Sequence, residues 1–132
     1  MTRHWKITSN PANLRPVRTE LEEFAHSAGM RLESTHALGL VLNEALANVI
    51  RHGYEGATDK LILVTAESVD NRFELSIRDW AKPFDPALVK HKIEGELSPG
   101  GLGLVCMKKL MDDVRFERLA DGMLLKMSKK IA

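Results

Sequence analysis

Two polar residues interrupt an otherwise apolar stretch, and their spacing is the first sign of chemistry in this sequence. Glu44 and Asn48 lie four positions apart within "LVLNEALANVIRHGY", residues 40–54. In a helix of about 3.6 residues per turn they would share one face with apolar neighbours such as Val41 and Ala45. Burying an unpaired carboxylate is costly. The pair therefore forms either a solvated helix edge or a site whose oxygen atoms hold a hard cation such as Mg²⁺.

Asp79 is the second candidate, because it ends a segment of alternating polarity. "RFELSIRD", residues 72–79, directs Phe73, Leu75 and Ile77 to one face, and the same parity directs Asp79 there. An aspartate at a strand end commonly caps the following turn. On the apolar face it could instead accept a hydrogen bond from a donor lodged between sheet and helices, such as the exocyclic amine of a purine.

A glycine cluster is the third candidate. In "PGGLGL", residues 99–104, Gly100, Gly101 and Gly103 would let backbone N–H groups close around phosphate oxygens at a helix N-terminus. The simpler interpretation is a turn that starts a helix. No Lys-Ser/Thr pair follows, so the segment is not a Walker A loop, and its spacing differs from that of the dinucleotide-binding fingerprint.

Hydrophobic periodicity predicts the elements that must position these residues. A proline after Asn10 makes that asparagine a good N-cap. The expected elements are a strand at 4–9, a helix from 10 to about 26, a helix from about 33 to 52, strands at 60–67 and 72–79, a long loop at 80–100, a helix to about 112, and a hairpin of 114–119 with 123–128. This order predicts an α/β (α+β) two-layer sandwich, a mostly antiparallel sheet with three helices on one face.

Composition narrows the class of protein. The 132 residues are expected to form a single domain, residues 1–132. A net charge of +1 gives no argument for nucleic acid, and no apolar run reaches the length of a membrane span. The N-terminus is too polar for a signal peptide, and the single Cys106 excludes an intrachain disulfide. We therefore expect a cytoplasmic protein.

Three motifs in a fixed order carry a resemblance to a known family. "NEALANVIRHGY", "IRDWAKPFDP" and "PGGLGLVCMKKLMDDVRF" together resemble the GHKL (Bergerat-fold) ATP-binding superfamily, above all the bacterial anti-sigma factors that are also serine-protein kinases. The resemblance covers about residues 33–130. It implies a Bergerat ATP-binding fold, ATP and Mg²⁺ as cofactors, and a homodimer. As partners it implies a sigma factor and an anti-anti-sigma (STAS-domain) protein that provides the substrate serine.

The resemblance also implies roles for single residues. Glu44 matches the catalytic general base, Asn48 the Mg²⁺ ligand, and Asp79 the aspartate that reads adenine. Gly101 and Gly103 match the glycines that contact phosphate, with Leu104 beside them at the cofactor site. Residues 82–99 match the lid over the nucleotide.

Two positions depart from the family pattern and bear on nucleotide affinity. Ala81 stands where the family usually has the glycine of Asp-x-Gly, and Leu124 stands where relatives often have threonine. Glu44 favours a kinase, whereas these two departures favour a non-catalytic switch protein of the same fold. A histidine-kinase catalytic domain cut from a longer chain is less favoured, because we expect the chain to be complete and it lacks a phospho-acceptor helix pair.

Overall fold

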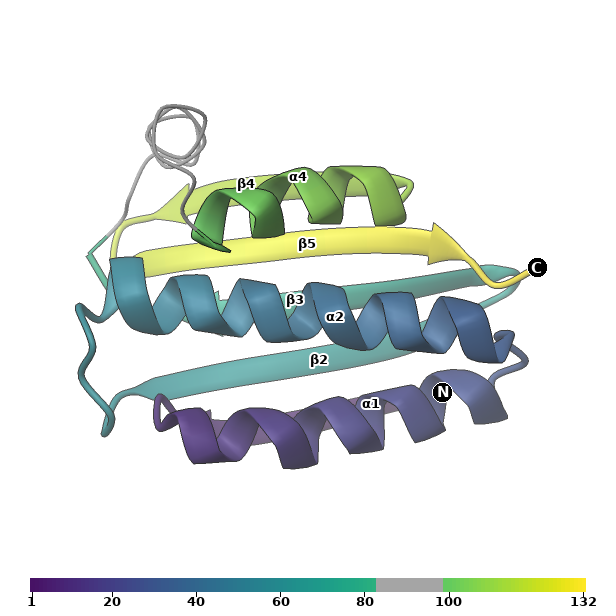
Figure 1. The fold of residues 1–132 in the computed structure, drawn as a ribbon, viewed down its shortest axis with the longest axis horizontal. Helices are drawn as coiled ribbons and strands as arrows, with labels where there is room; N and C mark the ends of the chain where they lie inside the picture. The colour runs from purple at the N-terminus through teal and green to yellow at the C-terminus, as the bar shows by residue number, and fades with distance from the viewer. Residues whose placement is uncertain (83–98) are drawn as a thin grey trace.

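The computed structural model describes residues 1–82 and 99–132, and the side chains of residues 1–82 and 105–132. This part of the chain forms a five-stranded antiparallel sheet, with three α-helices covering one of its faces (Figure 1). The strands are β1 (Thr2–Thr8), β2 (Leu61–Val69), β3 (Arg72–Asp79), β4 (Asp113–Leu119) and β5 (Gly122–Lys130). The predicted α+β two-layer sandwich is confirmed.

The sheet has the strand order β1-β2-β3-β5-β4, and every neighbouring pair is antiparallel. Phe73, Leu75 and Ile77 are buried on the helix-covered face, as the alternation of β3 predicts. Asp79 continues this parity and is only 3% exposed. It stands opposite Met123 of β5 in the register. The hairpin of β4 and β5 and the inward direction of Asp79 are therefore confirmed.

The first helix begins as predicted. The Asn10 side chain accepts a hydrogen bond from the N–H of Ala12 at 2.9 Å, which caps a 3-10 turn, Pro11–Asn13. That turn leads into α1 (Leu14–Ser27). The cap supplies a partner for one of the backbone donors that every helix start leaves unpaired.

The second helix, α2 (Leu32–Asn48), lies between α1 and α4 and above the sheet (Figure 1). It ends in a π turn, Val49–Gly53. Neighbours on both sides and below explain why it is apolar over most of its surface. Its buried apolar residues include Leu38, Val41, Leu42, Ala45 and Leu46.

The third helix, α4 (Pro99–Leu110), begins earlier than expected. The glycine cluster lies within its first turns rather than in front of it. Among the described residues, no helix is long and apolar enough to cross a bilayer.

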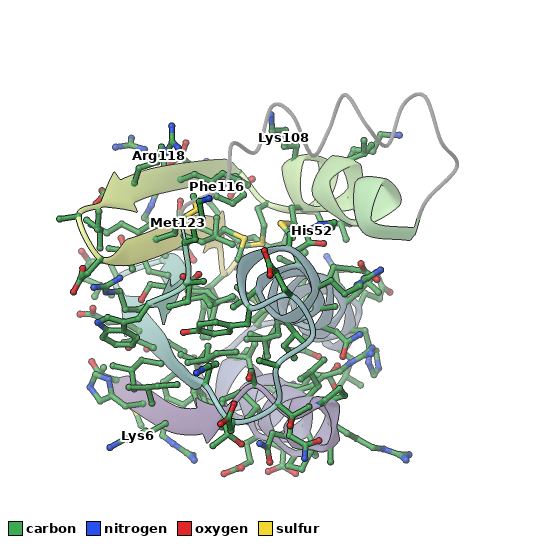
Figure 2. The ribbon with its side chains drawn as sticks, turned by 90° about the vertical axis from the view of Figure 1, so that its left-hand side faces the viewer. Lys6, His52, Lys108, Phe116, Arg118 and Met123 are labelled. Carbon is green, nitrogen blue, oxygen red and sulfur yellow. The ribbon has the colours of Figure 1, made fainter. Side chains whose placement is uncertain are left out.

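The chain brings the candidate residues to one end of the molecule. At the left of Figure 1, α2 and β3 end while α4 and β5 begin. Figure 2 looks onto this end, where His52 marks the π turn that follows α2 and Met123 marks the beginning of β5. Asn48, Asp79 and the glycine cluster thus belong to elements whose ends lie at the same edge. Of the lid expected at 82–99, residues 83–98 lie outside the described part of the chain.

Candidate functional site

The last turns of α2 carry two buried oxygen atoms without partners. Asn48 is 7% exposed, and its Oδ1 atom has no hydrogen-bond partner among the described residues. Glu44, one turn earlier, is half-buried as a residue. Its Oε2 atom is buried and also has no hydrogen-bond partner among the described residues. A buried acceptor without a partner costs about 1–3 kcal/mol. The solvated-edge alternative does not describe these atoms, because water does not reach them.

Asp79, in contrast, is held by the fold. Its Oδ1 atom accepts a hydrogen bond from the N–H of Ala81 at 2.9 Å, and its carboxylate also accepts from the N–H of Met123. Burial raises the pKa of the Asp79 carboxyl above its ordinary value; the two hydrogen bonds and the charge of Arg78 oppose this increase. The turn-capping role expected of a strand-end aspartate is thus present, together with a buried carboxylate.

Asn48 and Asp79 line one small cavity between the helices and the sheet. It encloses about 20 Å³, and its walls come from α2, β3, α4, β4 and β5. The lining residues are Ala45, Asn48, Val49, Ile77, Asp79, Met107, Phe116, Met123 and Leu125. Glu44 does not line it but lies one turn before Asn48 on the same helix. The structure therefore joins two of the predicted site residues directly and places the third beside them.

The glycine segment can be placed by its backbone alone. Gly101, Gly103 and Leu104 lie in the first turns of α4, which packs against α2. A helix N-terminus presents free N–H groups and a partial positive charge, which suit an anion. The glycines thus lie inside the first turns of a helix that was expected to begin after them, and contact with phosphate stays a prediction.

The two departures from the family pattern turn away from the cavity. Ala81 is 5% exposed, and its methyl group faces Gly53, so closely that a Cβ atom added at Gly53 would lie 2.9 Å from it. Leu124 has the opposite parity to the cavity-lining Met123, so its side chain lies on the other face of the sheet. Neither residue lines the cavity.

Sequence reasoning missed residues that shape this end of the molecule. Met123 and Phe116 line the cavity from the sheet. Figure 2 labels both residues, on β5 and β4. Gly122 has φ +150°, and a Cβ atom there would lie 2.1 Å from the carbonyl oxygen of Asp79, so only glycine fits this close approach. Alternation along β5 contained the signal for Met123, because Leu125 and Met127 of the same parity are apolar and buried.

Other hollows and side-chain clusters in the described part of the chain are weaker candidates for a functional site. A hollow of about 510 Å³ lies on the uncovered face of the sheet, but it is lined by mixed charges and contains none of the predicted site residues. Within residues 1–82 and 99–132, no three or more His, Cys, Asp or Glu side chains gather as a metal site. Mg²⁺ does not require such a group, since it usually shares one or two protein ligands with waters and substrate phosphates.

Comparison with known proteins agrees with this geometry. Residues 7–129 match the family described as the histidine kinase-like ATPase domain. The chain belongs to this family. The serine-protein kinase RsbW of Listeria innocua is 31% identical over 126 residues, which cover 86% of this chain and 80% of that protein. RsbW of Bacillus licheniformis is 27% identical, with 94% and 82% covered. The resemblance found in the sequence is thereby confirmed.

Solved structures share the fold of this family member. The RsbU and RsbW domains of a Mycobacterium tuberculosis protein superpose with a TM-score of 0.74 at 20% identity, covering 99% of this chain and 32% of that one. The catalytic domain of the histidine kinase ThkA superposes with a TM-score of 0.59 at 17% identity, covering 99% and 96%. These likenesses concern the fold alone.

Proposed function

We propose that this protein is an ATP-dependent serine-protein kinase that also acts as an anti-sigma factor. In one state it sequesters a sigma factor, and in the other it phosphorylates an anti-anti-sigma protein of the STAS-domain class. One observation carries the proposal: Asn48 and the buried carboxylate Asp79 line one cavity, and within the described part of the chain Asn48 Oδ1 and Glu44 Oε2 are buried without a hydrogen-bond partner. The similarity to serine-protein kinases supports the type of reaction.

We assign Mg²⁺ to the amide oxygen of Asn48. The atom fits, because it is buried, has no partner among the described residues, and is of the type that Mg²⁺ prefers. When bound, Mg²⁺ would neutralise charge on the phosphates of ATP. At the start of α4, where Gly101, Gly103 and Leu104 lie, backbone N–H groups would donate hydrogen bonds to phosphate oxygens. Gly101 lies in the first turn, whose N–H groups have no intrahelical partner.

We assign the adenine to the cavity between Asn48 and Asp79. An ionised Asp79 can accept a hydrogen bond from the exocyclic amine of adenine, and guanine lacks an amine at that position. The cavity of about 20 Å³ holds about one water molecule, so a purine requires its walls to move. Met107 and Met123 are suited to this, since unbranched thioether side chains repack at low cost.

Glu44 is the general base in this proposal. It lies one helical turn before Asn48 on α2, and its buried Oε2 atom has no hydrogen-bond partner among the described residues, so we assign the γ-phosphate to its vicinity. The acceptor serine oxygen forms a bond to the γ-phosphorus while the bond from that phosphorus to the ADP oxygen breaks. The serine proton passes to a carboxylate oxygen of Glu44.

The alternative is a non-catalytic switch protein of the same fold, which binds regulatory partners without phosphoryl transfer. Ala81 and Leu124 favour this alternative, because they depart from the family pattern at positions that bear on nucleotide affinity. Neither side chain lines the cavity, which leaves the base-like position of Glu44 as the stronger observation. The proposal further treats residues 1–132 as one domain of a cytoplasmic bacterial protein that forms a homodimer.

One experiment separates the kinase from the switch. The purified protein is incubated with Mg²⁺, ATP labelled at the γ-phosphate, and the STAS-domain protein encoded nearest to it. We expect label on a serine of the STAS protein, and none in a matched sample containing EDTA. ATP binding without labelled partner would support the switch, and absence of ATP binding would contradict both.

A further inference from the structure

A single phenol group joins the two walls of the candidate site. Tyr54 follows the π turn at the end of α2. Its hydroxyl donates a hydrogen bond to the carbonyl oxygen of Leu61 at 2.5 Å and accepts one from the N–H of Trp80 at 2.8 Å. Trp80 directly follows Asp79. The side chain thus connects the end of the helix that carries Asn48 to the strand end that carries Asp79.

A second contact lies beside the first. Gly53 faces the methyl group of Ala81, and a Cβ atom at Gly53 would lie 2.9 Å from the Cβ atom of Ala81. Ala81 in turn donates its N–H to Asp79 Oδ1 at 2.9 Å. The π turn after α2 therefore contacts Ala81, and Ala81 is hydrogen-bonded to the Asp79 carboxylate. The methyl group of Ala81 thus lies directly opposite Gly53.

The π turn determines where Tyr54 stands. The N–H of Tyr54 donates to the carbonyl oxygen of Val49 at 2.8 Å, a bond that spans five residues rather than four. Such turns occur frequently at functional sites. Val49 lines the cavity and directly follows Asn48. Burial raises the pKa of the Tyr54 phenol, so the hydroxyl keeps the proton that it donates to Leu61.

We propose that Tyr54, together with the contact between Gly53 and Ala81, is a positioning device that holds the Asp79 turn against the end of α2. This inference rests on the proposed function, because it concerns how Asp79 is held for a purine. Base selectivity then depends on α2 as well as on Asp79 itself. Tyr54 touches no substrate in this role, and it acts through Trp80 and Ala81.

The first test compares two hydroxyl deletions. Tyr54→Phe removes the bridge at the site. Ser9→Ala removes a matched bridge outside the cavity lining, where the buried Ser9 hydroxyl donates to Ala57 at 2.6 Å and accepts from the N–H of Lys60 at 3.0 Å. Calorimetry with Mg²⁺ measures the affinities for ATP and GTP, and hydrogen exchange reports the Trp80 and Ala81 amides. We expect Tyr54→Phe to reduce the preference for ATP by about tenfold and to speed both amides, whereas Ser9→Ala changes neither.

The second test exchanges the two small residues. Gly53→Ala alone places two methyl groups in one space, so we expect it to displace Ala81 and to reduce the preference for ATP. The double variant Gly53→Ala with Ala81→Gly moves the methyl group across the gap. We expect the double variant to restore the preference for ATP to within about threefold of the unmodified protein. The effects of substitutions at two contacting residues are not additive, so the second change can compensate for the first.

Each outcome decides a separate question. An unchanged ATP preference in Tyr54→Phe, with a loss of melting temperature like that of Ser9→Ala, would make Tyr54 a purely structural residue and overturn the inference. A double variant no better than Gly53→Ala would overturn the role of the contact. If Asp79→Asn keeps the preference for ATP, the assignment of Asp79 to the adenine is wrong, and the inference is overturned with it.

Discussion

The two polar walls of the site differ in how their groups are satisfied. On α2, Asn48 Oδ1 and Glu44 Oε2 are buried and have no hydrogen-bond partner among the described residues. On β3, Asp79 accepts hydrogen bonds from two backbone N–H groups. These two side-chain oxygen atoms therefore contribute no hydrogen bond within the described part of the fold, whereas two backbone N–H groups fix the orientation of Asp79. Changes to Glu44 and Asn48 should affect function without reducing stability. Changes at Asp79 should affect function and also shift stability, in a direction that depends on pH.

The largest effect is expected for Glu44→Gln. The amide keeps the size and shape of the side chain, so packing and ATP binding should persist. It cannot accept the serine proton, and removal of a general base costs a factor of about 10² to 10⁴ in rate. Single-turnover transfer to the STAS protein, measured beside ATP affinity, gives both quantities.

Glu33→Gln, at the exposed first turn of the same helix, is the matched control and should transfer phosphate normally. Normal transfer by Glu44→Gln would make Glu44 a structural residue. Loss of ATP binding by the same variant would instead place Glu44 in the metal site.

Asn48→Ala should abolish most Mg²⁺-dependent nucleotide binding and leave the fold intact. Even residues that only support a metal ligand are worth about 10- to 100-fold in affinity, so a direct ligand should be worth at least that. The lost oxygen has no protein partner among the described residues, so the melting temperature should not fall through a broken hydrogen bond.

Calorimetric titration with and without Mg²⁺ measures this effect, and Asn43→Ala on the same helix serves as the control. If Asn48→Ala retains Mg²⁺-dependent affinity, Asn48 is not the ligand. If it unfolds the protein, the comparison between the two walls is wrong on the α2 side.

Asp79→Asn should remove most of the difference in affinity between ATP and GTP. A buried hydrogen bond left unpaired is worth about 1–3 kcal/mol, which is the discrimination expected here. The Ala81 N–H can still donate to the amide oxygen, so the turn should survive. Competition titrations with both nucleotides measure the change, and an equal loss for ATP and GTP would indicate a structural role instead.

Local periodicity accounts for what the sequence predicted. The alternation of β3 predicted that Asp79 points inward, and the spacing of Glu44 and Asn48 predicted a shared helix face, because both patterns depend only on neighbours in the chain. The bridge from Tyr54 to Trp80 and the contact of Gly53 with Ala81 join segments more than 25 residues apart in sequence, and no local pattern encodes such pairs. The early start of α4 was missed because glycines favour a turn over a helix interior.

The smallest expected effect is on stability, and it also tests the β3 side of the comparison. Burial raises the pKa of Asp79, so the folded state binds the proton more tightly than the unfolded state does. Between the ordinary carboxyl pKa and this raised value, stability falls as pH rises, because the folded protein must then bury a charge. At neutral pH, Asp79→Asn removes that cost and should stabilise the protein slightly. Below the ordinary carboxyl pKa, Asp79 is neutral in the folded and the unfolded state, and the gain should disappear.

Denaturant unfolding across this pH range measures the gain in stability, with Asp113→Asn as a control for an exposed, ion-paired carboxylate. A gain at neutral pH that persists in acid would arise from packing rather than from charge, and a loss of stability at neutral pH would mean that the hydrogen bonds to Asp79 outweigh its burial.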